Sequence, residues 1–317
     1  MKVLILMFLF RFLTYSSSYE LNKEPIIGIL SIEISPDTSP SFPAYSSLIP
    51  ASYVKAVESS GARVVPVVIN KPKSYYENIV KSVNGLVLPG GGAKNGRGNP
   101  YYESVRTVYN LAKELNENGT VFPILGVCLG YEFLITAAND DVNLLHNCSI
   151  FYENYPINFI KSPSYAALYS RLTSEQRDTL ENYNSTMNWH IWCAYVEDFR
   201  NSVLLNNDWV ITSTSTSTKG VEFIASAEHK KYPFYGIQFH PEKVAFEWKS
   251  PNLPRGEKIL LANRYFYDQL VFVAKSNNQT FSSKKEERDA LIYNYPTRFD
   301  TNLKGAGGTS YTQLYLF

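Results

Sequence analysis

Short apolar runs alternate with amphipathic stretches through the first half of the chain. Buried strands are predicted by the runs at residues 26–30, 63–69, 85–88 and 122–127. Between them apolar positions recur at helical spacing, with predicted helices after Pro50 and near residues 75–83, 105–115 and 129–138. Strands that alternate with helices favour an α/β fold, in which helices cover a mostly parallel sheet.

The second half of the chain is less regular. Residues 221–227 and 235–239 predict strands, and residues 258–274 predict a helix with one apolar stripe. A polar run of Ser and Thr at 212–218 is typical of a turn or an exposed hairpin between strands. The residues after Asn277 carry charges and then glycines, so we expect them to wrap around the surface.

Composition and charge narrow the possible functions. A chain of 317 residues with 44% hydrophobic and 19% charged residues can bury a large core. The absence of a Pro- or Gly-rich linker and of an internal repeat favours one domain over residues 19–317. The formal net charge is +1, which leaves no basic surplus for a phosphate backbone. We therefore expect no nucleic-acid partner.

Residues 1–18 have the layout of a signal peptide. Lys2 precedes an apolar run at 3–10, Arg11 follows it, and serines occupy 16–18. The run is shorter than the roughly 20 apolar residues that span a bilayer, so we expect no membrane span. The competing interpretation of this run is a buried first strand.

Four Asn-X-Ser/Thr sequons also favour the secretory pathway. They begin at Asn118, Asn147, Asn184 and Asn278. A glycan requires each of these asparagines to lie on the surface. Leader and sequons together predict a glycoprotein that is secreted or delivered to a lysosome or vacuole.

The cysteine count leaves at least one free thiol. The chain has three cysteines, Cys128, Cys148 and Cys193. In an oxidising compartment an unpaired thiol is a candidate reactive group. Cys148 and Cys193 could form a disulfide, but the sequence leaves this open.

Gly126-Val127-Cys128-Leu129-Gly130 has the pattern of a nucleophile elbow with cysteine as the nucleophile. The turn from strand to helix is sharp, so it needs small residues two positions before and after the nucleophile. The N-terminus of the helix that follows lowers the pKa of the thiol and favours the thiolate. The alternative is a small apolar cysteine at the end of a strand. The flanking glycines favour the nucleophile.

His240 is the candidate base for this nucleophile. It ends the strand predicted at 235–239, and the carboxyl ends of parallel strands line one crevice. Glu242 can orient the imidazole and stabilise its charged form. A lone His-Pro-Glu tripeptide is typical of an exposed turn, but the elbow at Cys128 favours a catalytic set.

A glycine loop follows the strand predicted at 85–88. Glycines let backbone N–H groups approach a tetrahedral intermediate, so Gly91 and Leu129 are candidate donors to its oxyanion. The loop lacks the Gly-Lys-Ser/Thr ending of a phosphate loop. The histidines show no metal-ligand spacing among themselves or with the cysteines; they are His146, His190, His229 and His240. We expect no metal and no cofactor.

The glycine loop, the elbow and the His-Pro-Glu tripeptide, in this order and spacing, resemble the class I glutamine amidotransferase superfamily. Longer phrases resemble its γ-glutamyl hydrolase family, and they occupy residues 60–67, 128–132, 232–243 and 290–293. The resemblance spans nearly all of the chain after the leader. Val127 and Tyr131 are local departures.

The resemblance implies a flavodoxin-like three-layer sandwich and an enzyme that trims poly-γ-glutamate tails from folates and antifolates. It implies catalytic roles for Cys128, His240 and Glu242. It also implies that His190, Glu132 and Gly90 lie near the substrate. The competing interpretations are a surface histidine for the first and a solvated helix face for the second.

Three alternatives remain at this point. They are a glutaminase-type amidotransferase that supplies ammonia to a synthetase, a non-catalytic protein that binds γ-glutamyl chains, and a general cysteine peptidase. Export argues against the first, and the intact Cys, His and Glu set argues against the second. Only the wider resemblance argues against the third. A homodimer stays open.

Overall fold

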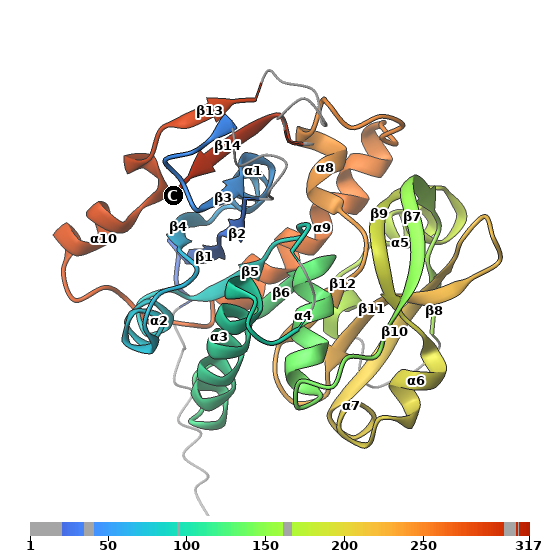
Figure 1. Cartoon of the computed structure of the whole chain (residues 1–317), viewed down its shortest axis with the longest axis horizontal. Helices are drawn as coiled ribbons and strands as arrows, with labels where there is room; N and C mark the ends of the chain where they lie inside the picture. The colour runs from blue at the N-terminus through green and yellow to red at the C-terminus, as the bar shows by residue number, and fades with distance from the viewer. Residues whose placement is uncertain (1–20, 35–40, 94–95, 161–166, 301–308, 310) are drawn as a thin grey trace, which may run out of the picture.

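A computed structural model describes residues 21–34, 41–93, 96–160, 167–300, 309 and 311–317. The predicted signal peptide, residues 1–18, lies outside the described residues. A central sheet of eight strands organises the rest (Figure 1). In spatial order its strands are β4 (Arg63–Val67), β1 (Ile26–Leu30), β5 (Gly85–Leu88), β6 (Ile124–Val127), β12 (Phe234–Ile237), β11 (Glu222–His229), β10 (Trp209–Thr216) and β8 (Asn158–Phe159). The first five are parallel and the last three extend the sheet antiparallel.

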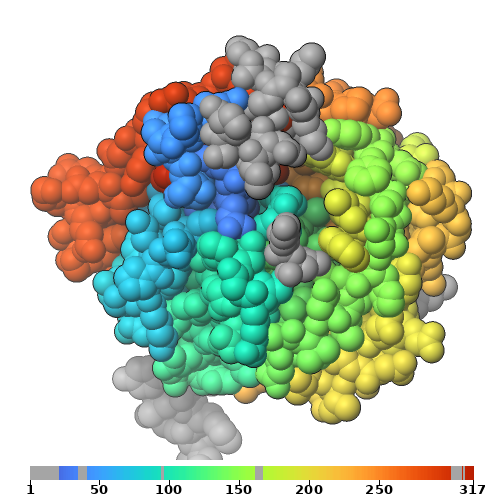
Figure 2. Space-filling model, viewed as in Figure 1, coloured from blue at the N-terminus to red at the C-terminus, as the bar shows by residue number. Residues whose placement is uncertain are grey.

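Helices cover both faces of this sheet. One layer holds α2 (Lys73–Val80), α3 (Pro100–Glu117) and α4 (Leu129–Ala138). Helices α2 and α3 lie on the face of the molecule seen in Figure 2, whereas α4 is buried beneath the surface. The other layer holds α1 (Ala51–Ser59), α8 (Pro241–Phe246) and α9 (Glu257–Ala274).

Strand side chains alternate between these two layers. In β1, Ile26 and Leu30 join the core under α2, α3 and α4, whereas Ile27 and Ile29 join the core under α1 and α9. A strand buried on both faces reads as a continuous apolar run, which is the pattern in the sequence. The predicted α/β class with a mostly parallel, helix-covered sheet is confirmed.

The expectation of a turn or exposed hairpin at 212–218 is wrong for most of that run. Residues 212–216 belong to β10, and four of them are buried inside the sheet. Hydroxyl groups hydrogen-bond one another there, with Ser226 Oγ 2.6 Å from the hydroxyls of both Thr212 and Ser213. Because these polar groups satisfy each other, a polar strand can be buried.

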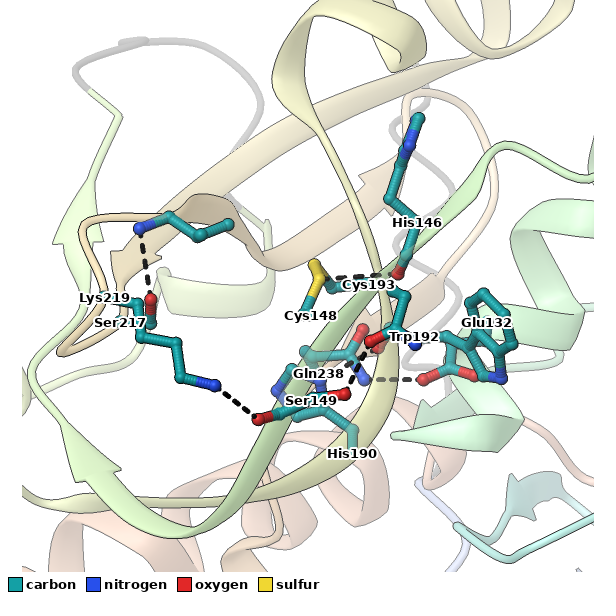
Figure 3. The surroundings of a disulfide bond; sticks show 12 residues. Glu132, His146, Cys148, Ser149, His190, Trp192, Cys193, Ser217, Lys219 and Gln238 are labelled. Atoms are coloured by element: carbon teal, nitrogen blue, oxygen red, sulfur yellow. Dashed lines mark hydrogen bonds between the residues drawn. A yellow bond between two sulfur atoms is a disulfide. The ribbon is translucent and has the colours of Figure 1, made fainter.

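A two-stranded antiparallel ribbon packs against β11, in the antiparallel part of the central sheet. It consists of β7 (Leu145–Tyr155) and β9 (Thr186–Ala194), with α5 (Ser174–Asn182) between them in sequence. A disulfide between Cys148 and Cys193 joins the two strands (Figure 3), which answers the question that the sequence left open. The short helices α6 (Val196–Asn201) and α7 (Val203–Asp208) then lead into β10.

The end of the chain does more than wrap around the surface. After α10 (Lys284–Ala290), strands β13 (Thr297–Phe299) and β14 (Gln313–Leu316) join a second sheet with β3 (Ser47–Pro50) and β2 (Ile32–Glu33). Leu314 in β14 is fully buried. The expectation of a surface tail is therefore wrong for this part, because the final strand has an apolar face to bury.

Two observations concern the secretory prediction. The four sequon asparagines, Asn118, Asn147, Asn184 and Asn278, are all exposed. Among the described residues no helix is long and apolar enough to cross a membrane.

Candidate active site

Cys128 occupies the tight turn between β6 and α4. Its backbone has φ 50° and ψ −114°, a conformation that residues with a side chain rarely adopt. Its N–H donates to the carbonyl of Ile237 in the neighbouring strand β12, and its carbonyl accepts from the N–H of Glu132 in α4. These bonds hold the turn from both sides. The thiol therefore sits at the carboxyl end of a central strand, where the elbow pattern placed it.

The glycines two positions before and after Cys128 leave no room for a side chain. A Cβ atom on Gly130 would lie 1.9 Å from the carbonyl oxygen of Leu88, and one on Gly126 would lie 2.9 Å from the carbonyl oxygen of Gly130. The ring of Tyr131 packs on Gly236 in the same way, 2.0 Å from where its Cβ would be. Close approach of backbone to backbone explains these glycines.

His240 and Cys128 flank the same glycine. A Cβ atom on Gly90 would lie 2.6 Å from Cε1 of His240 and 3.0 Å from Cβ of Cys128. The pairing of β12 with β6, which aligns Ile237 with Val127, brings the two strand ends side by side. The structure thus brings the predicted nucleophile and the predicted base together.

Glu242 completes a buried group with His240. Its Oε1 lies 2.8 Å from Nδ1 of His240, and both side chains are almost fully enclosed. The backbone of His240 is fixed as well, since its N–H donates to the carbonyl of Met187 in β9 at 2.8 Å. This arrangement leaves Nε2 of His240 as the ring nitrogen that can exchange a proton with the thiol.

Burial sets the protonation of the thiol. It raises the pKa of Cys128 well above the ordinary value, and the Glu132 carboxyl raises it further. The N–H of Leu129 and the Lys243 ammonium lower the pKa, but burial outweighs them. The expectation that the helix N-terminus alone would favour the thiolate is therefore not met. A base such as His240 is needed to take the proton.

The glycine loop is held by tyrosine hydroxyls. The N–H of Gly90 donates to the hydroxyl of Tyr53 at 2.8 Å, and the carbonyl of Gly90 accepts from the hydroxyl of Tyr311 at 3.4 Å. The next residue, Gly91, lies beside the elbow, because a Cβ atom there would be 3.5 Å from Cδ2 of Leu129. The two predicted oxyanion donors are thus neighbours.

Glu132 does not lie on a solvated helix face. It is buried, and the side-chain amide of Gln238 donates to its Oε1 at 2.8 Å (Figure 3). Burial raises the pKa of Glu132 to about 8, against the opposing effect of this hydrogen bond. The carboxyl is therefore protonated at acidic and neutral pH.

His190 is not a surface histidine either. It is buried in β9, where its Nδ1 lies 2.9 Å from the carbonyl oxygen of Trp192 and its ring meets the ring of Phe223 edge to face. Burial lowers the pKa of His190 to about 3, and the nearby His240 contributes to this shift. A neutral imidazole therefore lies close to the candidate base.

Three residues of the site were missed by sequence reasoning. The carbonyl oxygen of Trp189 lies 3.7 Å from Sγ of Cys128. Tyr311, near the end of the chain, contacts Gly90 through its hydroxyl. The ammonium of Lys243 lies over the rings of Trp189 and Tyr311. Lys243 directly follows the His-Pro-Glu tripeptide, and this position was a usable signal. Nothing in the sequence pattern marks Tyr311.

The candidate site offers no metal centre. Within the part of the chain that the structure describes, no group of three or more His, Cys, Asp or Glu side chains could hold an ion. An elbow cysteine beside a histidine and a carboxylate, on an α/β sheet, defines the class: a hydrolase whose nucleophile is a cysteine.

Comparisons with known proteins give the family. A family model described as Peptidase C26 matches residues 25–242. Gamma-glutamyl hydrolase of Rattus norvegicus is 34% identical, over 95% of this chain and 92% of that protein. The Homo sapiens protein of the same name is 33% identical over 93% and 90%, and Gamma-glutamyl hydrolase 2 of Arabidopsis thaliana is 31% identical over 94% and 84%.

The chain therefore belongs to the Peptidase C26 family and, with these relatives, to the γ-glutamyl hydrolases. It is a hydrolase with a cysteine nucleophile. These relatives do not favour the glutaminase-type and binding-protein alternatives. A solved structure titled "Structure of PurLQS from Thermotoga maritima" aligns with a TM-score of 0.49 and 14% identity, over 78% of this chain and 98% of that one.

Proposed function

We propose that this enzyme cleaves the γ-glutamyl amide bonds of folylpoly-γ-glutamates and of antifolate polyglutamates. The observation that carries the proposal is the buried elbow thiol of Cys128 beside the hydrogen-bonded pair of His240 and Glu242. The names of the relatives support the γ-glutamyl linkage, and the folate part of the substrate is what the sequence resemblance implies. A homodimer is compatible with this proposal, because one chain supplies every residue of the site.

The disulfide leaves Cys128 as the candidate nucleophile. The chain has three cysteines, and the disulfide occupies Cys148 and Cys193. Only Cys128 is free. A cysteine nucleophile in this chain must then be Cys128 while the disulfide is intact.

The proposed reaction has two stages. His240 takes the proton of the Cys128 thiol, and the sulfur attacks the γ-carbonyl carbon to form a tetrahedral intermediate. The N–H groups of Gly91 and Leu129 stabilise its oxyanion. His240 then donates the proton to the departing amine, which breaks the C–N bond and leaves a γ-glutamyl thioester. Water, deprotonated by His240, hydrolyses the thioester and regenerates the thiol.

Glu242 would act through His240. Its contact with Nδ1 would fix the imidazole and leave Nε2 to exchange a proton with the thiol, and its charge would stabilise the imidazolium that forms. This role matters more when the thiol pKa is high, because the proton must pass to His240 before sulfur can attack. His190, Glu132 and Gly90 remain candidates for contact with the substrate.

The same proposal includes the route of the protein through the cell. A signal peptide at residues 1–18 and glycans on the exposed sequons would take a single domain of residues 19–317 into the secretory pathway. The destination would be the medium, a lysosome or a vacuole.

The test is hydrolysis of pteroylpenta-γ-glutamate by the purified protein and by its Cys128→Ala variant, from acidic to neutral pH. We expect shorter folates from the native enzyme alone, and fastest in acid if the enzyme works in a lysosome or vacuole. Equal melting temperatures of the two proteins would show that the variant is folded. Turnover by Cys128→Ala at the native rate would exclude this nucleophile, and no turnover by either protein would refute the proposed activity.

A further inference from the structure

Lys243 is a fully buried lysine beside the candidate nucleophile. Its side chain has no exposed surface, and its Nζ has no hydrogen-bond partner in the described structure. A buried ammonium is costly unless an anion or several acceptors compensate it. Its position in the first turn of α8 is fixed, because its backbone N–H donates to the carbonyl of His240.

Two aromatic rings hold the Lys243 side chain near the thiol. Its Nζ lies 4.5 Å from the ring centre of Tyr311 and 5.1 Å from that of Trp189. The carbonyl of Trp189 is the hydrogen-bond partner of the Cys128 thiol, and the hydroxyl of Tyr311 contacts Gly90. The ammonium therefore lies beside two residues that themselves touch the site. Its charge also lowers the pKa of Cys128, in agreement with this position.

The neighbouring carboxylate does not neutralise Lys243 in this structure. Glu242 directs its Oε1 to His240, and no contact within hydrogen-bonding distance joins it to the ammonium. The rings of Trp189 and Tyr311 offer cation–π attraction, yet they accept no conventional hydrogen bond. The N–H donors of Lys243 therefore lack a hydrogen-bond acceptor in the described structure, and an anionic group of the substrate would supply one.

We propose that Lys243 binds the α-carboxylate of the glutamyl residue whose γ-carbonyl is attacked by Cys128. This inference rests on the proposed function and extends it to the recognition of the linkage. In a γ-linked chain each residue keeps a free α-carboxylate. In an ordinary peptide that carboxyl group is part of the amide bond. A fixed cation beside the nucleophile therefore distinguishes the two linkages.

An enclosed cation suits the glutamyl residue that stays on the enzyme better than it suits the glutamate that leaves. The glutamyl residue stays attached to sulfur through the thioester stage, whereas the amine must leave the site. Because the backbone of Lys243 is fixed in α8, a contact with the retained residue can persist through both stages. A contact with the leaving glutamate would have to break in the first stage.

The experiment compares three substrates: pteroyl-γ-diglutamate, its analogue with an α-carboxamide on the attacked residue, and its analogue with an α-carboxamide on the leaving residue. We expect the native enzyme to lose about 10- to 100-fold in kcat/KM on the first analogue, the range of a hydrogen bond to a charged group. It should lose much less on the second analogue.

The matched variants are Lys243→Met, Lys243→Arg and, as a control, Lys258→Met on the exposed start of α9. Lys243→Met should lose activity on the diglutamate and little on the first analogue, so that the preference for the carboxylate disappears. Lys243→Arg should restore part of that preference, and Lys258→Met should keep all of it. A group that only supports the fold or the thiolate would reduce the rates on all three substrates equally.

Several outcomes would overturn the inference. Equal cleavage of the diglutamate and the first analogue by the native enzyme would do so without any variant, even if Lys243→Met does not fold. A larger loss on the second analogue would assign the contact to the leaving residue instead. Failure of the native enzyme on every γ-glutamyl substrate would refute the proposed function itself, which separates the two failures.

Discussion

Cys128 has a backbone conformation that most residues avoid, and the surrounding backbone maintains it. The positive φ places the thiol at the tip of the turn, above the ends of β6 and β12. Strain of this kind costs about 1–3 kcal/mol and persists where neighbours overdetermine the geometry. Gly126 and Gly130 help to impose the geometry of the turn, since they let strand and helix backbones approach more closely than any side chain allows.

A first prediction concerns Gly130 in the first turn of α4. Helix propensity alone would make Gly130→Ala stabilising by about 1 kcal/mol. We expect the opposite, because the new Cβ would lie 1.9 Å from the Leu88 carbonyl oxygen and 2.9 Å from the Leu88 Cβ. The expected loss is about 3 kcal/mol or more, at the upper end of overpacking effects.

Urea unfolding of Gly130→Ala beside Gly92→Ala measures this loss. A Cβ on Gly92 meets nothing within 4 Å, so that variant should unfold at nearly the native midpoint. A Gly130→Ala protein as stable as the native one would contradict the steric explanation of the elbow.

The same residues show what the sequence reveals at this scale. The elbow glycines, Cys128 and His240 could be predicted because their constraints are local or lie at the ends of predicted strands. The environment of Glu132 could not, since its burial depends on Gln238 from another strand. Tyr311 is close to Gly90 only through the tertiary fold, because the two are 221 positions apart in sequence.

Elements with a clear apolar period were predicted well, and those without it were not. The strand at 26–30, the strand at 85–88 and the helix at 129–138 have the predicted bounds. β10 was missed because its buried faces carry hydroxyls that pair with each other rather than apolar groups. The ribbon of β7 and β9 gives a weak signal, because bulges interrupt its register and only three of the 11 residues of β7 are buried.

The ribbon leads to a second prediction, about the disulfide. Cys148 and Cys193 are 45 positions apart, and closing a loop of that length stabilises a fold by about 4 kcal/mol in the chain-entropy estimate. We expect the Cys148→Ala/Cys193→Ala double variant to lose free energy of unfolding of that order. Replacing Cys148 by Ala leaves the sequon at Asn147 intact, so glycosylation does not confound the comparison.

The measurement is denaturant unfolding of the double variant and of Cys128→Ala, which removes a thiol but keeps the disulfide. The Cys128→Ala midpoint should stay well above that of the double variant. Coincident midpoints of the double variant and the native protein would mean that the crosslink adds nothing to the stability of the ribbon.

Over the whole molecule, burial shifts the pKa values of two carboxyls upward and those of two histidines downward. Burial raises the pKa of Glu132 to about 8 and that of Glu228 to about 7. Burial lowers the pKa of His190 to about 3 and that of His229 to about 4. All four are therefore neutral in mild acid, although they lie in different parts of the fold. In an unfolded chain the ordinary values are about 4.3 for Glu and about 6.5 for His.

The two sets act on stability with opposite signs. As the pH rises above about 4.3, the unfolded chain releases carboxyl protons that the folded chain keeps, so the free energy of unfolding falls by about 1.4 kcal/mol per pH unit for each carboxyl. As the pH falls below about 6.5, the histidines of the unfolded chain bind protons, whereas the buried histidines of the folded chain stay neutral. The free energy of unfolding therefore falls with decreasing pH, again by about 1.4 kcal/mol per pH unit for each histidine. Between these values the effects of two carboxyls and two histidines cancel.

The third prediction follows: stability should be nearly constant from about pH 5 to 6.5 and should fall from about pH 6.5 to 8, where only the carboxyls still act. Glu132→Gln removes one of them, so its stability relative to the native protein should rise by about 2 kcal/mol over that upper interval. Urea unfolding at a series of pH values measures this, with Glu181→Gln on the exposed face of α5 as the control. A native protein more stable at pH 8 than at pH 6 would contradict the predicted balance of the buried groups. A Glu132→Gln curve parallel to the native one would show that Glu132 is ionised in the folded enzyme. Because the plateau lies in mild acid, the fold as a whole suits an acidic compartment, in agreement with the proposed lysosomal or vacuolar destination.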